Sequence, residues 1–282
     1  MRAVLSAAVV CLFLATCASA QAIGTVTLAE GDLHIIRGTT VSTAVQGTRL
    51  RRGDILESSS RGLTQVECGP ESVIAIGPSS KVFLFSGSTS GSTRAELVLL
   101  SGWLKAETHA RAGTYQFDTP WLAASASRGT VVLRAASESS DIFVESGSAS
   151  VAEVGASGIT GQFRSAKGGE FFSRRAGKGL ASSNGPADNF VQSMPNAFKD
   201  TLPPRLSLAG RKDVEPGRGR EIEYEQLRPY LVMPARWRRD FVSRFESRLD
   251  DPKFRQGIVA HLHDHPEWEP ALHPEGNSTN KQ

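Results

Sequence analysis

Residues 117–130 read Phe-Asp-Thr-Pro-Trp-Leu-Ala-Ala-Ser-Ala-Ser-Arg-Gly-Thr, and this stretch decides the fold class. Pro120 has no backbone N–H and pushes Thr119 toward extended geometry, so the chain turns here without forming a helix. Gly129 supplies the backbone freedom that a reversal or a bulge needs before the apolar run 131–134. The stretch predicts a corner between β-strands, and it has no pattern typical of a catalytic site.

The chain on either side of this corner is also strand-like. From residue 24 to about residue 154, short apolar segments alternate with Gly, Ser, Asp and Pro at intervals of ~8–10 residues. Such spacing is typical of sandwiches, barrels and β-solenoids. Three segments, 26–33, 98–104 and 143–151, each combine a strand, a glycine and a second strand. Stacked units of this kind predict a mainly β module, either β-helix-like (a β-solenoid) or a twisted sandwich.

Several motifs follow one another in an order that resembles the FecR domain. They are Gly24-Thr25-Val26, Gly53-Asp54-Ile55-Leu56-Glu57, Ser79-Ser80-Lys81-Val82, Leu97 to Leu104, Phe117-Asp118-Thr119-Pro120, Arg128-Gly129-Thr130 and Val144-Glu145-Ser146-Gly147. The resemblance covers roughly residues 23–155, and we place the whole FecR-like β domain at residues 21–175. It implies an all-β periplasmic module in which the following motif residues have structural roles: Gly53, Asp54, Gly102, Thr119, Pro120, Arg128, Gly129, Thr130 and Gly147.

The best-known members of that family are anti-sigma regulators with a cytoplasmic helical segment and a membrane span ahead of this domain. Here we expect the module to follow a signal peptide directly, so the resemblance does not transfer anti-sigma activity. Arg2, the apolar run 4–15 and Ala18-Ser19-Ala20 predict a signal peptide over residues 1–20, cleaved after Ala20. A lipoprotein anchored at Cys17 is the alternative, although Thr16 is bulkier than the residue such sites favour. We therefore expect a periplasmic protein without a transmembrane segment after signal removal.

Signal cleavage would leave Cys68 as the single cysteine, so no internal disulfide is expected. Cys68 is interpreted as a small buried hydrophobe rather than a reactive thiol. The formal net charge of +3 gives no concentrated basic face of the kind that nucleic acid requires.

Residues 176–188 are predicted to be a linker, and residues 189–282 a helical, partly irregular C-terminal region rich in proline and charge. Helices are expected over 224–231, 234–249 and 252–263 from their apolar spacing. Arg236, Arg238 and Arg239 beside Trp237 suggest either contact with an anionic surface or a solvated helix face. The interleaved acidic residues favour the solvated face.

Two groups of residues suggest chemistry. His261, His263 and His265 surround an aspartate in a pattern suited to zinc, but further ligands are missing, so a helix end is the preferred interpretation. Asp118 is interpreted as a turn carboxylate, because the sequence names no acid–base partner for it. No catalytic, cofactor-binding or metal-binding residue is assigned.

The sequence therefore predicts a non-catalytic, FecR-like protein-interaction module of the periplasm, acting in envelope signalling or assembly with an envelope protein as partner. The alternative is a glycan- or peptidoglycan-associated structural protein, with Trp103 and Trp121 as stacking candidates, although buried packing is the preferred role for both. A metal-dependent hydrolase using the tail histidines is the remote alternative.

Overall fold

The computed structural model describes residues 22–68, 72–85, 93–109, 113–155, 158–203 and 214–273. The predicted signal peptide and Cys17 lie outside these ranges. Within them, no helix combines the length and apolarity needed to cross a membrane.

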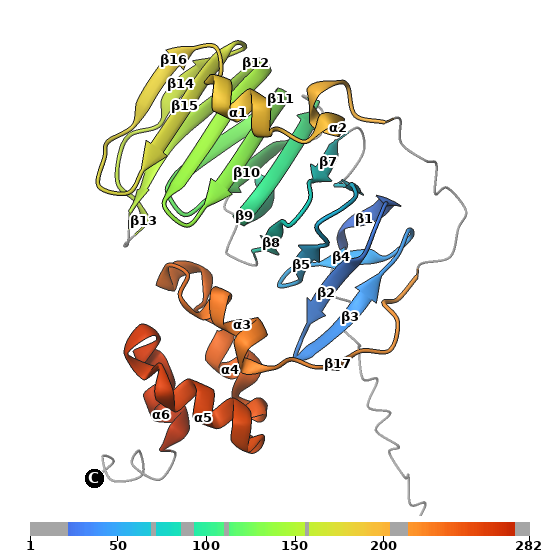
Figure 1. The fold of residues 1–282 in the computed structure, drawn as a ribbon, viewed down its shortest axis with the longest axis vertical. Coiled ribbons are helices and arrows are strands. Elements are labelled where there is room, and N and C mark those ends of the chain that lie inside the picture. The colour runs from blue at the N-terminus through green and yellow to red at the C-terminus, as the bar shows by residue number, and fades with distance from the viewer. Residues whose placement is uncertain are drawn as a thin grey trace, which may run out of the picture.

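The described chain is mainly β, as predicted, and its strands form one large mixed sheet folded into a sandwich (Figure 1). The strands are β1 (Ala22–Ala29), β2 (Leu33–Arg37), β3 (Thr40–Ala44), β4 (Arg49–Arg51), β5 (Ile55–Ser58), β6 (Thr64–Glu67), β7 (Val73–Ile76), β8 (Lys81–Leu84), β9 (Thr93–Thr108), β10 (Thr114–Asp118), β11 (Leu122–Ala136), β12 (Ser139–Gly155), β13 (Gly158–Ile159), β14 (Arg164–Lys167), β15 (Glu170–Arg175), β16 (Ala181–Asn184) and β17 (Arg220–Glu221).

Pairing divides these strands into two layers. Layer 1 runs β17, β3, β2, β5, β8, the first half of β9, β10, the first half of β11, the second half of β12 and β14. Layer 2 runs β4, β1, β6, β7, the second half of β9, the second half of β11, the first half of β12, β15 and β16. The layers do not close into a barrel, and β9 pairs with β10 in parallel.

The three longest strands bend from one layer into the other at a glycine. Gly102 in β9, Gly129 in β11 and Gly147 in β12 have φ angles of 91°, 122° and 77°, which are strained for any other residue. Gly129 and Gly147 are register partners, and a Cβ on Gly129 would lie 2.1 Å from the carbonyl oxygen of Ser146. Two bulges flank Gly129, so the Arg-Gly-Thr motif is a bend inside one strand rather than a break between two.

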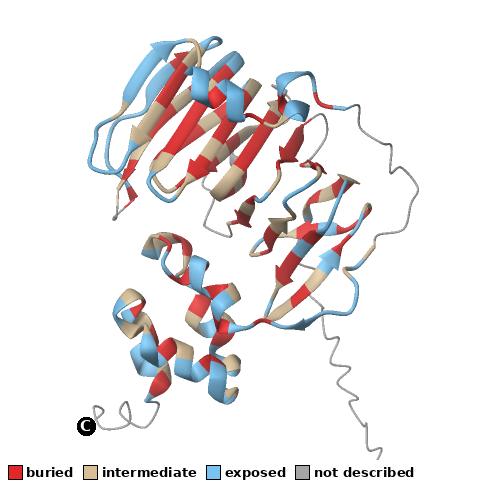
Figure 2. Ribbon diagram, in the orientation of Figure 1, coloured by how far each residue is buried: buried red, intermediate tan, exposed pale blue. Residues whose placement is uncertain are grey.

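Alternation along the strands produces three apolar clusters. Inward-facing side chains such as Ile35, Leu104 and Leu133 fill the space between the layers. Outward-facing side chains are also buried, because helices cover both outer faces (Figure 2). A sandwich strand buried on both faces explains why the sequence shows short continuous apolar runs instead of strict alternation.

Two short helices cover the outer face of layer 2. They are α1 (Asp188–Ser193) and α2 (Asn196–Lys199), which place Phe190, Met194 and Phe198 on Trp103 and Phe171. The ring centroids of Trp103 and Phe190 are 5.0 Å apart.

The C-terminal tail covers the outer face of layer 1. It comprises α3 (Tyr224–Leu231), η2 (Ala235–Trp237), α4 (Phe241–Phe245), η3 (Glu246–Asp250), α5 (Pro252–Ala260), η4 (Leu262–Asp264), η5 (Pro266–Trp268) and α6 (Glu269–Leu272). Phe241 packs edge-on against Phe83 of β8 with ring centroids 5.7 Å apart. The tail core and the outer face of layer 1 form one continuous apolar cluster.

Two elements differ from the sequence expectations. The predicted linker 176–188 includes the edge strand β16, all of whose residues are exposed, so no apolar pattern marks it. The helix expected over 234–249 is divided into η2, α4 and η3. Its apolar residues Trp237, Phe241, Phe245 and Leu249 are nevertheless all buried, because they follow the sandwich surface and not one helix axis.

Candidate interaction sites

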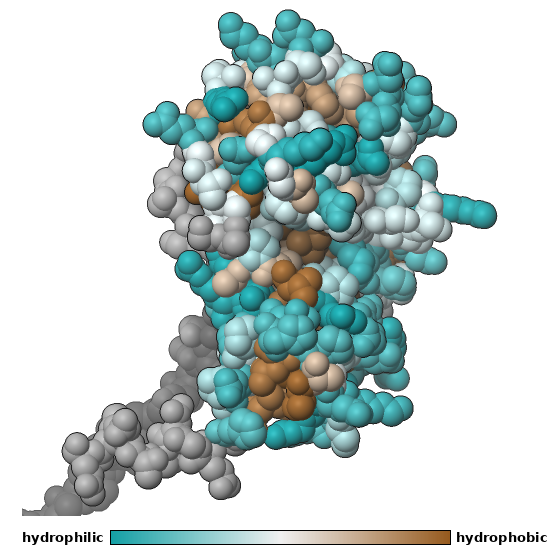
Figure 3. Space-filling model, turned by 60° about the vertical axis from the view of Figure 1, so that its left-hand side comes forward, coloured by the Kyte–Doolittle hydropathy of each residue, from teal (hydrophilic) through white to brown (hydrophobic). Residues whose placement is uncertain are grey.

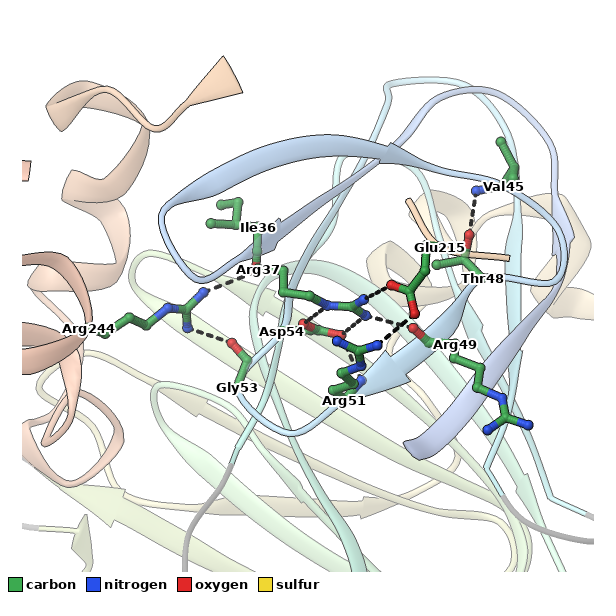
Figure 4. Close-up of polar contacts among 10 residues, drawn as sticks. All are labelled: Ile36, Arg37, Val45, Thr48, Arg49, Arg51, Gly53, Asp54, Glu215 and Arg244. Atoms are coloured by element: carbon green, nitrogen blue, oxygen red, sulfur yellow. Dashed lines mark hydrogen bonds and ion pairs between the residues drawn. The ribbon is translucent and has the colours of Figure 1, made fainter. Parts of the chain in front are cut away.

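The tail is fastened to layer 1 along a line of polar contacts, which we call the seam: Arg244, Tyr230, Gln226 and Arg236 of the tail with Gly53, Glu57 and Asp118 of the sandwich. Arg244 contacts three backbone carbonyl groups of the sandwich. Its guanidinium donates to the carbonyl oxygens of Gly53 at 2.5 Å and Ile36 at 3.0 Å (Figure 4). It also donates to the carbonyl oxygen of Gly38 at 2.9 Å. Burial lowers the pKa of Arg244 to about 10, so it remains charged at neutral pH.

Asp54, a residue of the FecR-like motif, holds the turn that Arg244 contacts. Its side chain is buried and accepts from Arg37 at 2.8 and 2.9 Å and from the backbone N–H of Arg51 at 2.7 Å (Figure 4). Glu215 contacts Arg37 and Arg51 from outside at 3.0 and 2.6 Å. Asp54 therefore presents the carbonyl of Gly53, whose φ is 87°, to the tail.

Glu57 supplies a second contact in the seam. Its carboxylate accepts from the Tyr230 hydroxyl at 2.6 Å and from Gln226 at 3.2 Å, and it pairs with Lys81 at 3.4 Å. Burial, and after it the negative charge of Glu57, raises the pKa of Tyr230 well above its ordinary value. The hydroxyl therefore keeps its proton and remains a donor.

Asp118 lies at the far end of the seam, beside the Thr-Pro corner. Thr119 closes that corner by donating to the carbonyl of Leu122 at 2.7 Å and accepting from the Leu122 N–H at 2.9 Å. Asp118 is only 1% exposed and accepts from Gln116 and from Arg236, each at 2.7 Å. Asp118 is thus a buried acceptor for the tail as well as a turn carboxylate.

The remaining motif residues form the bend and not a pocket. Arg128 is exposed, Thr130 is half-buried, and the backbone of Arg128 lies against Gly147 across the bend. The motif residues thus divide into two places: Gly53, Asp54, Thr119 and Pro120 at or near the seam, and the others at the bends between the layers. Sequence reasoning grouped all of them as structural.

Lys105 fastens the second covering segment. Its ammonium group is 1% exposed and donates to the carbonyl oxygens of Phe198 at 3.0 Å and Asp200 at 2.9 Å, and it pairs with Glu145 at 2.8 Å. Lys105 therefore caps the C-terminal end of α2 from within the sheet.

The arginines of the tail correct the solvated-face interpretation. Arg236 pairs with buried Asp118, Arg238 donates to the carbonyl of Met233 and pairs with Glu267, and Arg248 donates to the carbonyl of Ile222. Only Arg239 of the three predicted residues is exposed. Apart from Met233, these partners are distant in the sequence and have no local signal in it.

The tail histidines have separate surroundings. His265 is fully buried and lies 3.3 Å from the Tyr224 hydroxyl, whereas the His261 ring contacts the carbonyl of Gly257 at 3.1 Å. His263 is exposed and contacts Asp264. Among the described residues, no cluster of three or more His, Cys, Asp or Glu side chains could hold a metal ion.

The tryptophans and the cysteine pack within the chain. Trp103 is 9% exposed and lies under Phe190, and Arg134 is 5.5 Å from its ring centroid. Trp121 is only half-buried, with the Arg174 guanidinium carbon 5.5 Å from its ring centroid, so the expected burial holds for Trp103 and not for Trp121. Cys68 is buried, as expected for a small hydrophobe, and burial raises the pKa of its thiol to about 12.

Because both faces are covered, the parts of the sandwich left open by the described residues are sheet edges. β14 pairs with β12 along one side, and β16 pairs with β15 along one side, with no second partner for either within the described ranges. Two large apolar side chains lie near the β14 edge, Ile159 at 41% and Phe163 at 44% exposure. Figure 3 brings this end of the molecule forward and shows hydrophobic surface on the sandwich as well as on the tail.

Comparison with known proteins yields a distant likeness. No family model and no curated protein matches the chain. Two crystal structures of a candidate anti-sigma factor from Parabacteroides distasonis, at 1.65 and 2.50 Å resolution, are similar with a TM-score of 0.40 and 11% identity. Each match covers 49% of this chain, and it spans 62% and 64% of the respective neighbour, less than two thirds of its length.

Proposed function

We propose that this protein is a non-catalytic protein-interaction module of the periplasm, acting in envelope signalling or assembly. The observation that carries the proposal is that the chain covers both outer faces of its own sandwich and leaves the β14 edge open. An open edge offers unpaired backbone groups to an extended segment of another protein, which adds a strand.

Exposed apolar side chains strengthen the assignment of this edge. Ile159 and Phe163 are exposed in the segment that leads into β14, and they would give a partner apolar contacts beyond backbone hydrogen bonds. Arg164 and Lys167 on β14 are exposed, and they favour a partner segment that carries acidic residues. The buried charges at the seam are paired with groups of the same chain, which supports structural roles for them.

The resemblance to the FecR domain supports the cellular setting of the proposal. The predicted signal peptide would deliver the module to the periplasm, where such domains contact other envelope proteins. The candidate partner is therefore an envelope protein with an extended acidic segment.

In-cell crosslinking of the tagged protein, followed by mass spectrometry, tests the proposal. We expect one dominant envelope protein, and we expect Phe163→Asp to reduce its capture at least tenfold. Val259→Asp is the matched control, because Val259 is 54% exposed on α5 and lies in the tail. Equal capture by both variants, or recovery of only sacculus fragments, would contradict the proposal.

A further inference from the structure

A pair of carboxyl groups lies under the tail at the end of the seam. Glu96 of β9 and Asp118 of β10 are on neighbouring parallel strands, where Glu96 pairs in register with Gln116 and Val98 pairs with Asp118. Alternation along the strands directs both side chains to the outer face of layer 1, the face that the tail covers. Glu96 therefore lies diagonally across from Asp118 on this face, within reach of its carboxylate.

Within the described ranges, Asp118 forms an ion pair and Glu96 does not. Arg236 of η2 lies 2.7 Å from Asp118, and its guanidinium carbon lies 4.5 Å from the ring centroid of Trp237. The charged groups facing Glu96 are Asp118 from β10, Arg236 from the tail and Arg52 from the turn between β4 and β5. While one of the two carboxyl groups is protonated, the net charge of Glu96, Asp118 and Arg236 together is zero. When that proton is lost, their net charge is −1.

Two carboxyl groups can share a hydrogen bond only while one of them is protonated. Burial first, and the charge of Asp118 second, raise the pKa of Glu96 from 4.5 to about 7. Burial also raises the pKa of Asp118, but Arg236 at 2.7 Å opposes that shift, so we assign the proton to Glu96 and keep Asp118 as the acceptor for Arg236. The site changes its charge state close to neutral pH.

We propose that Glu96, Asp118 and Arg236 form a proton-operated latch that holds the η2 segment of the tail on the sandwich. Protonated Glu96 donates to Asp118 and keeps the carboxylate oriented toward Arg236. After deprotonation, Glu96 repels Asp118 and competes for Arg236, so the tail opens more readily. Opening would uncover the apolar outer face of layer 1, including Ile55, Phe83 and Val98.

The size of the effect follows from linkage between protonation and opening. With a pKa of about 7 when the tail is closed and 4.5 when the group is solvated, the closed-to-open ratio falls about tenfold between pH 6 and pH 8. Hydrogen exchange measured by mass spectrometry on peptides from residues 224–245, corrected for intrinsic rates, reports this ratio directly.

Three proteins are compared: the wild type, Glu96→Gln and the control Glu225→Gln, whose side chain is 74% exposed on α3. We expect tail protection in the wild type and in Glu225→Gln to fall about tenfold from pH 6 to pH 8. Glu96→Gln, which keeps a donor but cannot lose a proton, should show the same protection at both values. An equal pH response in Glu96→Gln and the wild type would overturn the latch.

A second measurement does not depend on the variant folding. Carbon-13 NMR of the Glu96 carboxyl group in the wild type should give a titration midpoint near pH 7. A midpoint near 4.5 would also overturn the latch. Neither result bears on partner capture at Phe163, so the latch and the proposed function fail independently.

Discussion

Arg244→Met removes the central contact of the seam while keeping an apolar side chain of similar length. The guanidinium of Arg244 donates to three backbone carbonyl groups and lies 4.6 Å from the ring centroid of Phe245. The bonds to Gly53 and Ile36 are partly buried, and the bond to Gly38 is exposed. A hydrogen bond from a charged donor contributes about 1.5–3 kcal/mol, whereas the exposed carbonyl regains water, so the variant should lose about 3–6 kcal/mol of unfolding free energy.

Urea denaturation followed by circular dichroism measures this loss, with Arg239→Met as the control. Arg239 lies five residues earlier in the same tail and is exposed, so its substitution should change stability by less than about 0.5 kcal/mol. If Arg244→Met also lost under 1 kcal/mol, the tail would not be fastened to the sandwich by this side chain. That result would refute the reasoning about the seam.

Three further changes test other parts of the structure. Gly129→Ala places a Cβ 2.1 Å from a backbone oxygen at a φ of 122°, so it should lower the free energy of unfolding in urea by more than about 2 kcal/mol. The control Gly179→Ala should change it little, because a Cβ there meets nothing within 4 Å. Equal effects would argue against the bend. Lys105→Met leaves two helix-end carbonyl groups and Glu145 without their donor and should cost about 2–4 kcal/mol by urea unfolding, and a neutral result would remove its role as a cap. Folding raises the pKa of Glu96, so the stabilisation from protonated Glu96 is complete below pH 4.5 and is lost as the pH rises to about 7. The free energy of unfolding measured across this range should therefore fall by more in the wild type than in Glu96→Gln.

The β architecture is largely readable from local sequence. Gly102, Gly129 and Gly147 were identified because only glycine tolerates the tight bend, and each bends with positive φ. The helix predicted over 224–231 coincides with α3. Signals of this kind depend only on residues that are neighbours in the chain, so they can be recognised from the sequence without the fold. The exposed strand β16 has no apolar pattern and was not visible in this way.

The seam could not be read from the sequence, because its partners are far apart in the chain. Arg236 and Asp118 are separated by 118 positions, and Arg244 contacts carbonyl groups 191 to 208 positions away. The composition of the tail suggested solvated arginines, since acidic residues alternate with them. Only the folded chain shows that the guanidinium groups are drawn to backbone carbonyls and to a buried carboxylate on another element. Glu96 was missed for the same reason.

Hydrogen exchange of the full chain at pH 6 tests most directly whether the chain covers both faces of its sandwich and leaves β14 open. We expect amides of β2, β5 and β8 to exchange only with global unfolding, together with the long strands β11 and β12, and amides of α3 to be strongly protected. We expect β14 to exchange faster along its open side. Rapid exchange throughout α3 and residues 235–245, or full protection of β14, would contradict the arrangement described here.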